Sequence, residues 1–155
     1  CPERMAEYLS LEEDKRRDWF NRLVRSGHIR DEPYLPNLWL GATCEDQATL
    51  DERIPYLVKT PAAVRFLSLE PLLERVDISG WLETFNPPNW IILGCESGVK
   101  RRPCKIEWID NLAHQGMEAG IPVFVKQLDI GGKVVKDWDD PLFPEHLKIR
   151  EFPNG

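Results

Sequence analysis

Four short apolar runs recur along the chain, with polar or turn residues on both sides of each. They cover residues 38–43, 64–69, 90–95 and 122–125. Runs of this length that show no polar alternation are typical of strands buried on both faces of a parallel sheet. We therefore predict four strands, and a parallel sheet is the arrangement that the pattern favours.

Charged residues follow each of these runs. Three runs lead into a glutamate and the fourth leads into a lysine and a glutamine: Glu45, Glu70, Glu96, Lys126 and Gln127. In parallel α/β folds the ligands bind where the carboxyl ends of the strands meet. The charged residues are therefore expected to share one edge of the sheet, with Lys126 balancing the carboxylates.

Helical patterns alternate with the strands. Apolar residues at helical spacing predict helices over 2–9, 10–26, 46–58 and 105–119. Asp46 is a candidate N-cap for the third of these, and Gly120 has the position of a residue that ends the fourth. Residues 71–75 have room for one or two turns, and 77–89 are expected to be mostly loop because they contain a glycine and a Pro-Pro pair.

The spacing of the runs suggests how the elements connect. Strand starts near 38, 64, 90 and 122 suit successive βα units that return to the same edge in parallel. Four such units make about half of a (β/α)₈ barrel or one side of an open doubly wound sheet. We expect one α/β domain over 1–155, with 131–155 as an irregular tail that holds a short strand near 148–152.

The beginning of the chain favours the half barrel over the open sheet. It opens on Cys1 and Pro2 without an initiator methionine, so a preceding segment is expected. A half barrel would leave a strand edge exposed, and such edges tend to pair. The expected partners are a missing N-terminal half or a second copy of the chain.

Composition narrows the class of protein. The net charge is −6 and the isoelectric point is about 5.1, which argues against wholesale binding of nucleic acid or of an anionic membrane. No apolar run reaches the roughly 18 residues of a membrane span, and no signal peptide is visible. The four cysteines are widely spaced and are expected to be reduced thiols. The sequence therefore predicts a soluble, cytoplasmic protein.

Several stretches of the chain resemble known sequences. They are Pro-Glu-Arg-Met at 2–5, Asn-Leu-Trp-Leu-Gly at 37–41, Arg-Phe-Leu-Ser-Leu-Glu-Pro-Leu at 65–72, Trp-Ile-Ile-Leu-Gly-Cys-Glu-Ser-Gly at 90–98, Val-Phe-Val-Lys-Gln at 123–127 and Arg-Glu-Phe-Pro at 150–153. Together they resemble a family of uncharacterised phage and bacterial proteins over nearly the whole chain. Longer members of that family look like radical-S-adenosylmethionine barrels with an N-terminal cysteine-rich stretch for an iron–sulfur cluster. This chain lacks that stretch, so the resemblance implies that it corresponds to the C-terminal part of such a protein.

The resemblance and the strand ends together define candidate ligand-binding residues. They are Thr43, Glu45, Ser68, Glu70, Cys95, Glu96, Ser97, Lys126 and Gln127. The ligand that the resemblance implies is S-adenosylmethionine, and no iron–sulfur ligands are expected in this chain. Clustered carboxylates require a ligand, a metal or a cation beside them. A purely structural Glu–Lys network at the sheet edge is therefore the alternative.

The segment after the third run contains a second group of candidate binding residues. Glycines at 94 and 98 flank a polar turn, and Lys100, Arg101 and Arg102 follow it before the last helix. These cations and the helix amides could hold a phosphate or a carboxylate, and nucleic acid remains a weaker candidate for the anion.

Cys95 is a candidate nucleophile, with Cys44 as its possible neighbour, although buried structural thiols are the more frequent case. Metal-binding motifs are absent from the sequence, and a magnesium site made from Glu45, Glu70 and Glu96 is left open.

Two functions follow from these observations. The first is the C-terminal half of a radical-S-adenosylmethionine-like barrel that supplies ligand-binding residues for an unidentified substrate. The second is a non-catalytic, phage-related binding or assembly module in which the charged edge is structural. Whether the protein is an enzyme is left open by the sequence.

Overall fold

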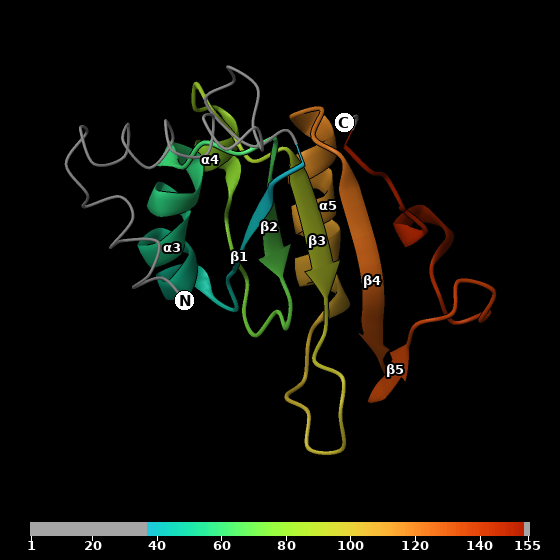
Figure 1. Cartoon of the computed structure of the whole chain (residues 1–155). Coiled ribbons are helices and arrows are strands. Elements are labelled where there is room, and N and C mark those ends of the chain that lie inside the picture. The colour runs from blue at the N-terminus through green and yellow to red at the C-terminus, as the bar shows by residue number, and fades with distance from the viewer. Residues whose placement is uncertain (1–36, 154–155) are drawn as a thin grey trace, which may run out of the picture.

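The computed structural model describes residues 37–153 and places five strands in one sheet (Figure 1). The strands are β1 (Trp39–Thr43), β2 (Val64–Leu69), β3 (Trp90–Gly94), β4 (Val123–Ile130) and β5 (Lys133–Val135). Their order in the sheet is the order in the chain. The pairs β1–β2, β2–β3 and β3–β4 are parallel, whereas β5 is antiparallel to β4. The predicted α/β class and the four predicted strands are confirmed.

Within residues 37–153, three α-helices and one 3₁₀ helix accompany the sheet. They are α3 (Gln47–Lys59), α4 (Ser79–Leu82), α5 (Ile106–Glu118) and η1 (Glu145–Leu147). The predicted helices at 46–58 and 105–119 are thus confirmed, while those at 2–9 and 10–26 lie outside the described residues. Asp46 caps α3 as expected: its carboxylate accepts from Thr49 N, and the Thr49 hydroxyl accepts from the Asp46 amide.

One face of the sheet is covered by helices and contains the core. Leu67, Ile91 and Val123 lie on this face and are fully buried. A side chain at Gly116 of α5 would collide with Val123 and crowd Ile91, so this helix packs closely on β3 and β4. The connection through α4 joins the same layer, because the Ile78 amide donates to Gln115 of α5. The helix layer and the sheet therefore share one core.

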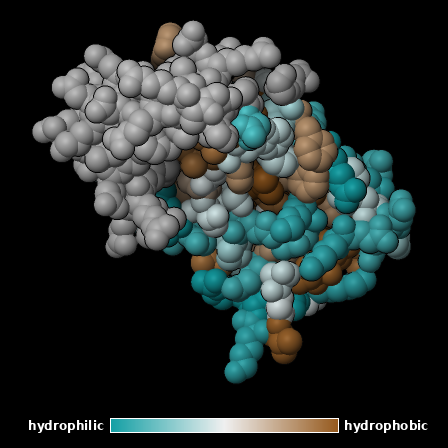
Figure 2. Space-filling view, viewed as in Figure 1, coloured by the Kyte–Doolittle hydropathy of each residue, from teal (hydrophilic) through white to brown (hydrophobic). Residues whose placement is uncertain are grey.

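The opposite face of the sheet, called the open face below, carries no helix from residues 37–153. Its aromatic side chains cluster toward the amino ends of the strands: Trp39, Phe66, Trp90, Phe124 and Phe152, with neighbouring ring centroids 5.4 to 6.0 Å apart. Trp39 and Phe152 remain 45% and 59% exposed. Figure 2 shows hydrophobic side chains in the middle of this view and hydrophilic ones below them, toward the carboxyl ends.

The end of the chain is more ordered than the sequence predicted. Residues 131–155 were expected to be irregular, but Gly131 and Gly132 form a turn with positive φ that leads into β5. The expected short strand at 148–152 is a single antiparallel bridge between Arg150 and Phe124. It places Phe152 against Trp90 and Phe124. The tail therefore closes part of the outer edge of β4.

Two other expectations were wrong in detail. Residues 71–75 contain no helical turn, and the short helix α4 lies inside the segment that was expected to be mostly loop. Its start is set by Asp77, whose side chain accepts from the Ser79 amide and whose own amide donates to Gln47 of α3. The bond between Asp77 and Gln47 joins residues 30 positions apart and leaves no local pattern in the sequence. The sheet formed by the described strands is open, not closed into a barrel.

Candidate functional site

A β-bulge in β4 determines the geometry at the carboxyl edge of the sheet. Leu93 pairs with Val125, but the next residue of β3, Gly94, pairs with Gln127, so Lys126 is an extra residue in β4. Val125 and Leu128 are both fully buried, as a bulge between them requires. Lys126 and Gln127 were expected to follow a strand ending at Val125, and this was wrong because β4 continues to Ile130.

The bulge brings Lys126 and Gln127 to the same carboxylate, although consecutive residues of a regular strand point to opposite faces. The Lys126 ammonium lies 3.0 Å from one oxygen of Glu70 and 3.1 Å from the other. The Gln127 amide donates to Glu70 Oε1 at 2.9 Å and to the Cys95 carbonyl at 2.6 Å. Gln127 is only 2% exposed. Two consecutive side chains of β4 therefore hold Glu70, and the second of them, Gln127, is buried and also bonded to the backbone at Cys95.

Gly94 provides the space for this arrangement. A Cβ at position 94 would lie 3.3 Å from the Glu70 carboxyl carbon and 3.5 Å from Gln127 Cγ. Both contacts place the Glu70 and Gln127 side chains above Gly94. The Gly94 carbonyl also accepts from the Leu72 amide, which fixes the segment after Glu70. The three residues Glu70, Lys126 and Gln127 are called the carboxylate triad below.

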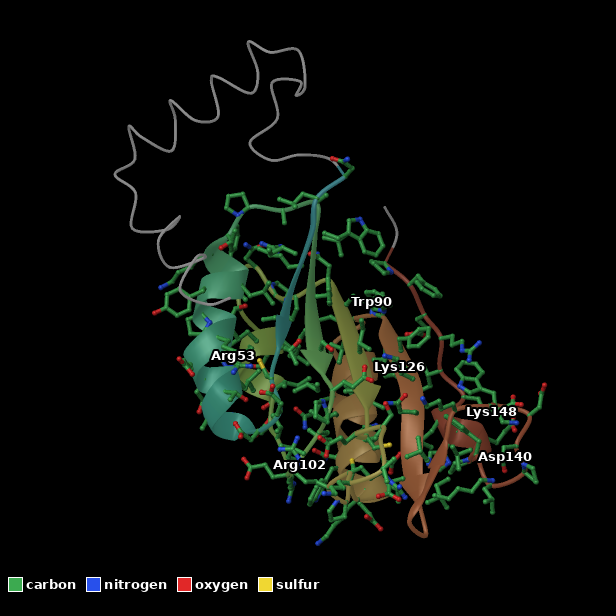
Figure 3. The ribbon with its side chains drawn as sticks, turned by 60° about the horizontal axis from the view of Figure 1, so that its bottom comes forward. Arg53, Trp90, Arg102, Lys126, Asp140 and Lys148 are labelled. Atoms are coloured by element: carbon green, nitrogen blue, oxygen red, sulfur yellow. The ribbon has the colours of Figure 1, made fainter. Side chains whose placement is uncertain are left out.

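A second charged pair lies at the end of β1. Arg53 of α3 donates to Glu45 Oε2 at 3.0 Å and also to the Thr43 carbonyl. Arg53 lies two helical turns after the N-cap and therefore on the same side of the helix as the start of α3. Arg53 was not predicted from the sequence, although this spacing could have indicated it. Figure 3 shows Arg53 on the α3 side of the edge and Lys126 on the β4 side.

The third carboxylate, Glu96, pairs with an arginine in the loop after β3. Arg102 Nη2 donates to Glu96 Oε1 at 2.7 Å, Arg102 Nε donates to Oε2 at 2.9 Å, and the Arg102 backbone amide also donates to Oε2 at 2.7 Å. The bidentate contact lowers the pKa of Glu96 to about 2. Arg102 was predicted to bind an external anion, and its anion in this structure is Glu96.

The remaining candidates are distributed around these pairs. Thr43 and Ser68 are paired across β1 and β2, and within residues 37–153 neither hydroxyl has a hydrogen bond. Ser97 and Lys100 are exposed on the loop after β3. Arg101 is partly buried, and its Nε atom has no hydrogen-bond partner in the described part of the chain. Their roles in binding stay predictions.

The described cysteines are buried free thiols. Burial raises the pKa of Cys44 and Cys104 to about 12 and that of Cys95 to about 11. The charge of Cys95 contributes to the raised pKa of Cys104, and the expected position of Cys44 beside Cys95 stays a prediction. High pKa values and burial are unfavourable for a nucleophile. The structural interpretation of these thiols is the one that the geometry favours.

The carboxylates at the edge of the sheet were also candidates for binding a metal ion. Among residues 37–153 no three His, Cys, Asp or Glu side chains come together in a way that could hold a metal ion. The magnesium site suggested for Glu45, Glu70 and Glu96 is therefore wrong, because each of these carboxylates faces its own cation. The described residues also do not fit an iron–sulfur cluster, which cysteine thiolates hold.

Comparison with known families adds one finding. Residues 2–138 match the family described as "Protein of unknown function (DUF5131)". The chain belongs to this family. No curated protein and no solved structure matches the chain. Membership in DUF5131 thus confirms the expected kinship with an uncharacterised family and assigns no activity.

One further result concerns membranes. Within residues 37–153, none of the helices has the length and apolar character needed to cross a bilayer.

Proposed function

We propose that this DUF5131 protein contributes one part of a (β/α) barrel and binds a small organic ligand, S-adenosylmethionine or a related molecule, at the carboxyl edge of its sheet. The observation that carries the proposal is the bulge in β4, which directs Lys126 and Gln127 together onto Glu70. Bulges of this kind are frequent beside active sites, where they redirect a side chain. The triad lies at the strand edge where parallel α/β folds bind their ligands.

The barrel part of the proposal rests on topology. Four parallel strands follow one another in chain order, and the α-helices of the described residues lie on one face of the sheet. A doubly wound sheet carries helices on both faces. The open face has aromatic side chains at one end and charged side chains at the other, which suits the interior of a barrel whose remaining strands come from elsewhere.

The edge of the sheet formed by β1 supports the need for additional strands. Within the described residues no strand pairs with the outer side of β1, and Trp39 on this strand is 45% exposed. Unpaired edges of this kind favour pairing with another strand. The missing strands would come from a preceding half of a longer protein of the radical-S-adenosylmethionine type or from a second chain.

Calorimetric titration of the protein with S-adenosylmethionine tests the ligand. We expect saturable binding that falls at least about tenfold in Glu70→Gln, since hydrogen bonds to charged groups contribute about 1.5 to 3 kcal/mol. Glu118→Gln is the matched control, because Glu118 is exposed at the end of α5, where it pairs with His114. Absence of saturable binding by the wild-type protein, or equal losses in the two variants, would contradict the proposal.

A second candidate function is a non-catalytic binding or assembly module, which the sequence resemblance relates to phage proteins. The observation that favours it is that Glu45, Glu70 and Glu96 each already have a cationic partner. Such a network can be purely structural. A stable dimer in sedimentation equilibrium, together with no binding of S-adenosylmethionine, is the result that would favour this candidate over the first.

A further inference from the structure

The loop after β3 projects beyond the carboxyl ends of the strands (Figure 1). Buried cysteines anchor it at both ends. The Cys95 amide donates to the Gln127 carbonyl at 3.2 Å, and the Cys104 amide donates to Asp129 Oδ2 at 3.4 Å. Since Gln127 and Asp129 both belong to β4, the two ends of the loop are fixed on the same strand of the sheet.

A clamp between Glu96 and Arg102 closes the loop just outside these anchors. The two side chains form a bidentate pair, and the Arg102 backbone amide donates to the same carboxylate at 2.7 Å. Charge-assisted bonds of this geometry are stronger than hydrogen bonds between neutral groups. The clamp separates residues 97–101 from the sheet, and this segment is called the loop tip below.

The loop tip combines an apolar side chain with two cations. Val99 is fully exposed, so it contributes nothing to the core. Lys100 is exposed and Arg101 is only partly buried. Neither cation forms a hydrogen bond or an ion pair with residues 37–153. The loop is therefore braced at its neck, while the apolar and basic side chains of its tip are left for another molecule to contact.

This combination suits a polymer that carries negative charges and apolar surfaces in alternation. A nucleic-acid strand has both, because its phosphates attract lysine and arginine and its base faces pack against apolar side chains. An anionic lipid bilayer presents similar features over a broad plane, but the net charge of −6 opposes the approach of the whole protein to such a plane. A single strand can contact the loop tip alone. One valine also buries too little apolar surface to hold a protein in a bilayer.

We propose that the loop tip binds a nucleic-acid strand. Lys100 and Arg101 contact two of its phosphates, and Val99 packs against the face of an unstacked base. The bases of a duplex are stacked on one another, so single strands bind more tightly than duplexes. This inference goes beyond the small ligand proposed above and does not depend on it. It gives a partner to the two cations of the basic segment that Glu96 leaves free.

Fluorescence anisotropy with labelled single-stranded DNA and RNA of mixed sequence tests the proposal. We expect saturable binding at low salt to at least one of the two probes, and the difference between them shows which sugar the site prefers. The logarithm of the affinity should fall with the logarithm of the salt concentration with a slope of about −1.4, since each of two phosphate contacts contributes about −0.7. A duplex of the same sequence should bind more weakly.

Charge variants locate the binding on the loop tip. Lys100→Glu should weaken binding at least about tenfold and change the slope to about −0.7, because one phosphate contact is lost. Lys59→Glu is the matched control, since it makes the same change of charge at the exposed end of α3. Lys59 precedes β2 and so lies at the opposite end of the sheet, where salt screens its effect on the loop.

A second pair of variants tests the apolar contact. Val99→Ser should weaken binding at least about threefold, because it removes an apolar side chain from the base. Phe85→Ser changes another fully exposed apolar residue, which lies in the connection before β3, and should leave the affinity unchanged. The melting temperature of each variant shows whether it is folded.

Three results would overturn the proposal. The first is the absence of saturable binding to either oligonucleotide at low salt. The second is an equal loss in Lys100→Glu and Lys59→Glu, because binding would then depend on the overall charge and not on the loop tip. The third is binding of the protein to phosphatidylserine vesicles but to neither oligonucleotide, which would make a membrane the partner. None of these results bears on the titration with S-adenosylmethionine.

Discussion

Gly94 lies directly beneath the carboxyl group of Glu70. A Cβ at position 94 would be 3.3 Å from Glu70 Cδ, a contact closer than side chains ordinarily tolerate. Glu70 cannot move away without lengthening its hydrogen bonds to Lys126 and Gln127. The absence of a side chain at 94 is therefore part of how the carboxylate triad is built.

Gly94→Ala should disturb the triad more than the fold. The added methyl group displaces the Glu70 carboxyl by a few tenths of an ångström, which weakens two hydrogen bonds. We expect the affinity for S-adenosylmethionine to fall about tenfold while the free energy of unfolding changes by less than about 1 kcal/mol. Calorimetric titration and urea denaturation measure the two quantities.

Gly80→Ala is the control for this change. Gly80 lies in α4 with open space around it, and alanine favours helix there. It should leave the affinity unaltered. Equal affinities of Gly94→Ala and the wild type would show that Glu70 does not need its observed position.

Gly41→Ala tests the packing of the open face. The Phe66 ring lies against Gly41, and a Cβ at position 41 would be 2.2 Å from the ring. Overpacking of this kind costs about 1 to 3 kcal/mol, so urea denaturation should show a loss of about 2 kcal/mol in the free energy of unfolding. Combined with Phe66→Leu, the same alanine should cost at least about 1 kcal/mol less, because the obstructing ring is gone. Strictly additive effects would contradict the contact.

The titration of Glu96 reports on the loop after β3. Its pKa is lowered from 4.5 to about 2 by Arg102. A carboxyl group whose pKa is lower in the folded state stabilises the fold above its unfolded pKa, and this contribution is lost as the pH falls from about 4.5 to about 2. Carbon-13 NMR of the Glu96 carboxyl should give a midpoint near 2 in the wild type and a midpoint close to 4.5 in Arg102→Gln. The control is Arg53→Gln, which removes the partner of Glu45 instead and should not move the Glu96 midpoint. A wild-type midpoint near 4.5 would show that the bidentate pair does not form.

The buried thiols should be slow to react in the folded protein. In a Cys1→Ser background, labelling by iodoacetamide at pH 7.5 reports on Cys44, Cys95 and Cys104. With pKa values of about 11 to 12, each should react at least about a hundredfold more slowly than in urea-unfolded protein, since the thiolate is the nucleophile. Peptide mass spectrometry assigns the sites. Labelling of Cys95 within minutes would instead support its role as a nucleophile.

The strands and the two long helices could be predicted from the sequence because their signals are local. Apolar runs mark β1, β2 and β3, and Asp46 and Gly120 mark the start of α3 and the end of α5. The extent of β4 could not be predicted, since Lys126 and Gln127 interrupt its apolar run. They are accommodated by a bulge that depends on pairing with β3. The β5 strand depends in the same way on its partner.

The site was predicted in part. The strand ends gave Glu70, Lys126 and Gln127 correctly as neighbours at one edge. The expectation of a shared carboxylate cluster failed because Arg53 and Arg102 each neutralise a different glutamate. Both arginines reach their partners through the folding of a helix or a loop back onto the strand edge. Geometry of that kind is set by tertiary packing, which residue spacing alone does not specify.

The most direct test of the account follows the Gln127 side-chain amide by ¹H–¹⁵N NMR during titration with S-adenosylmethionine. This amide links Glu70 to the Cys95 carbonyl, so a ligand on the carboxylate triad must alter its environment. The account predicts saturable shifts of the Gln127 side chain and of the Gly94 and Lys126 backbone amides, with the Gly80 amide unchanged. Saturable shifts confined to other residues, or no shifts at millimolar ligand, would contradict the claim that this edge of the sheet is the binding site.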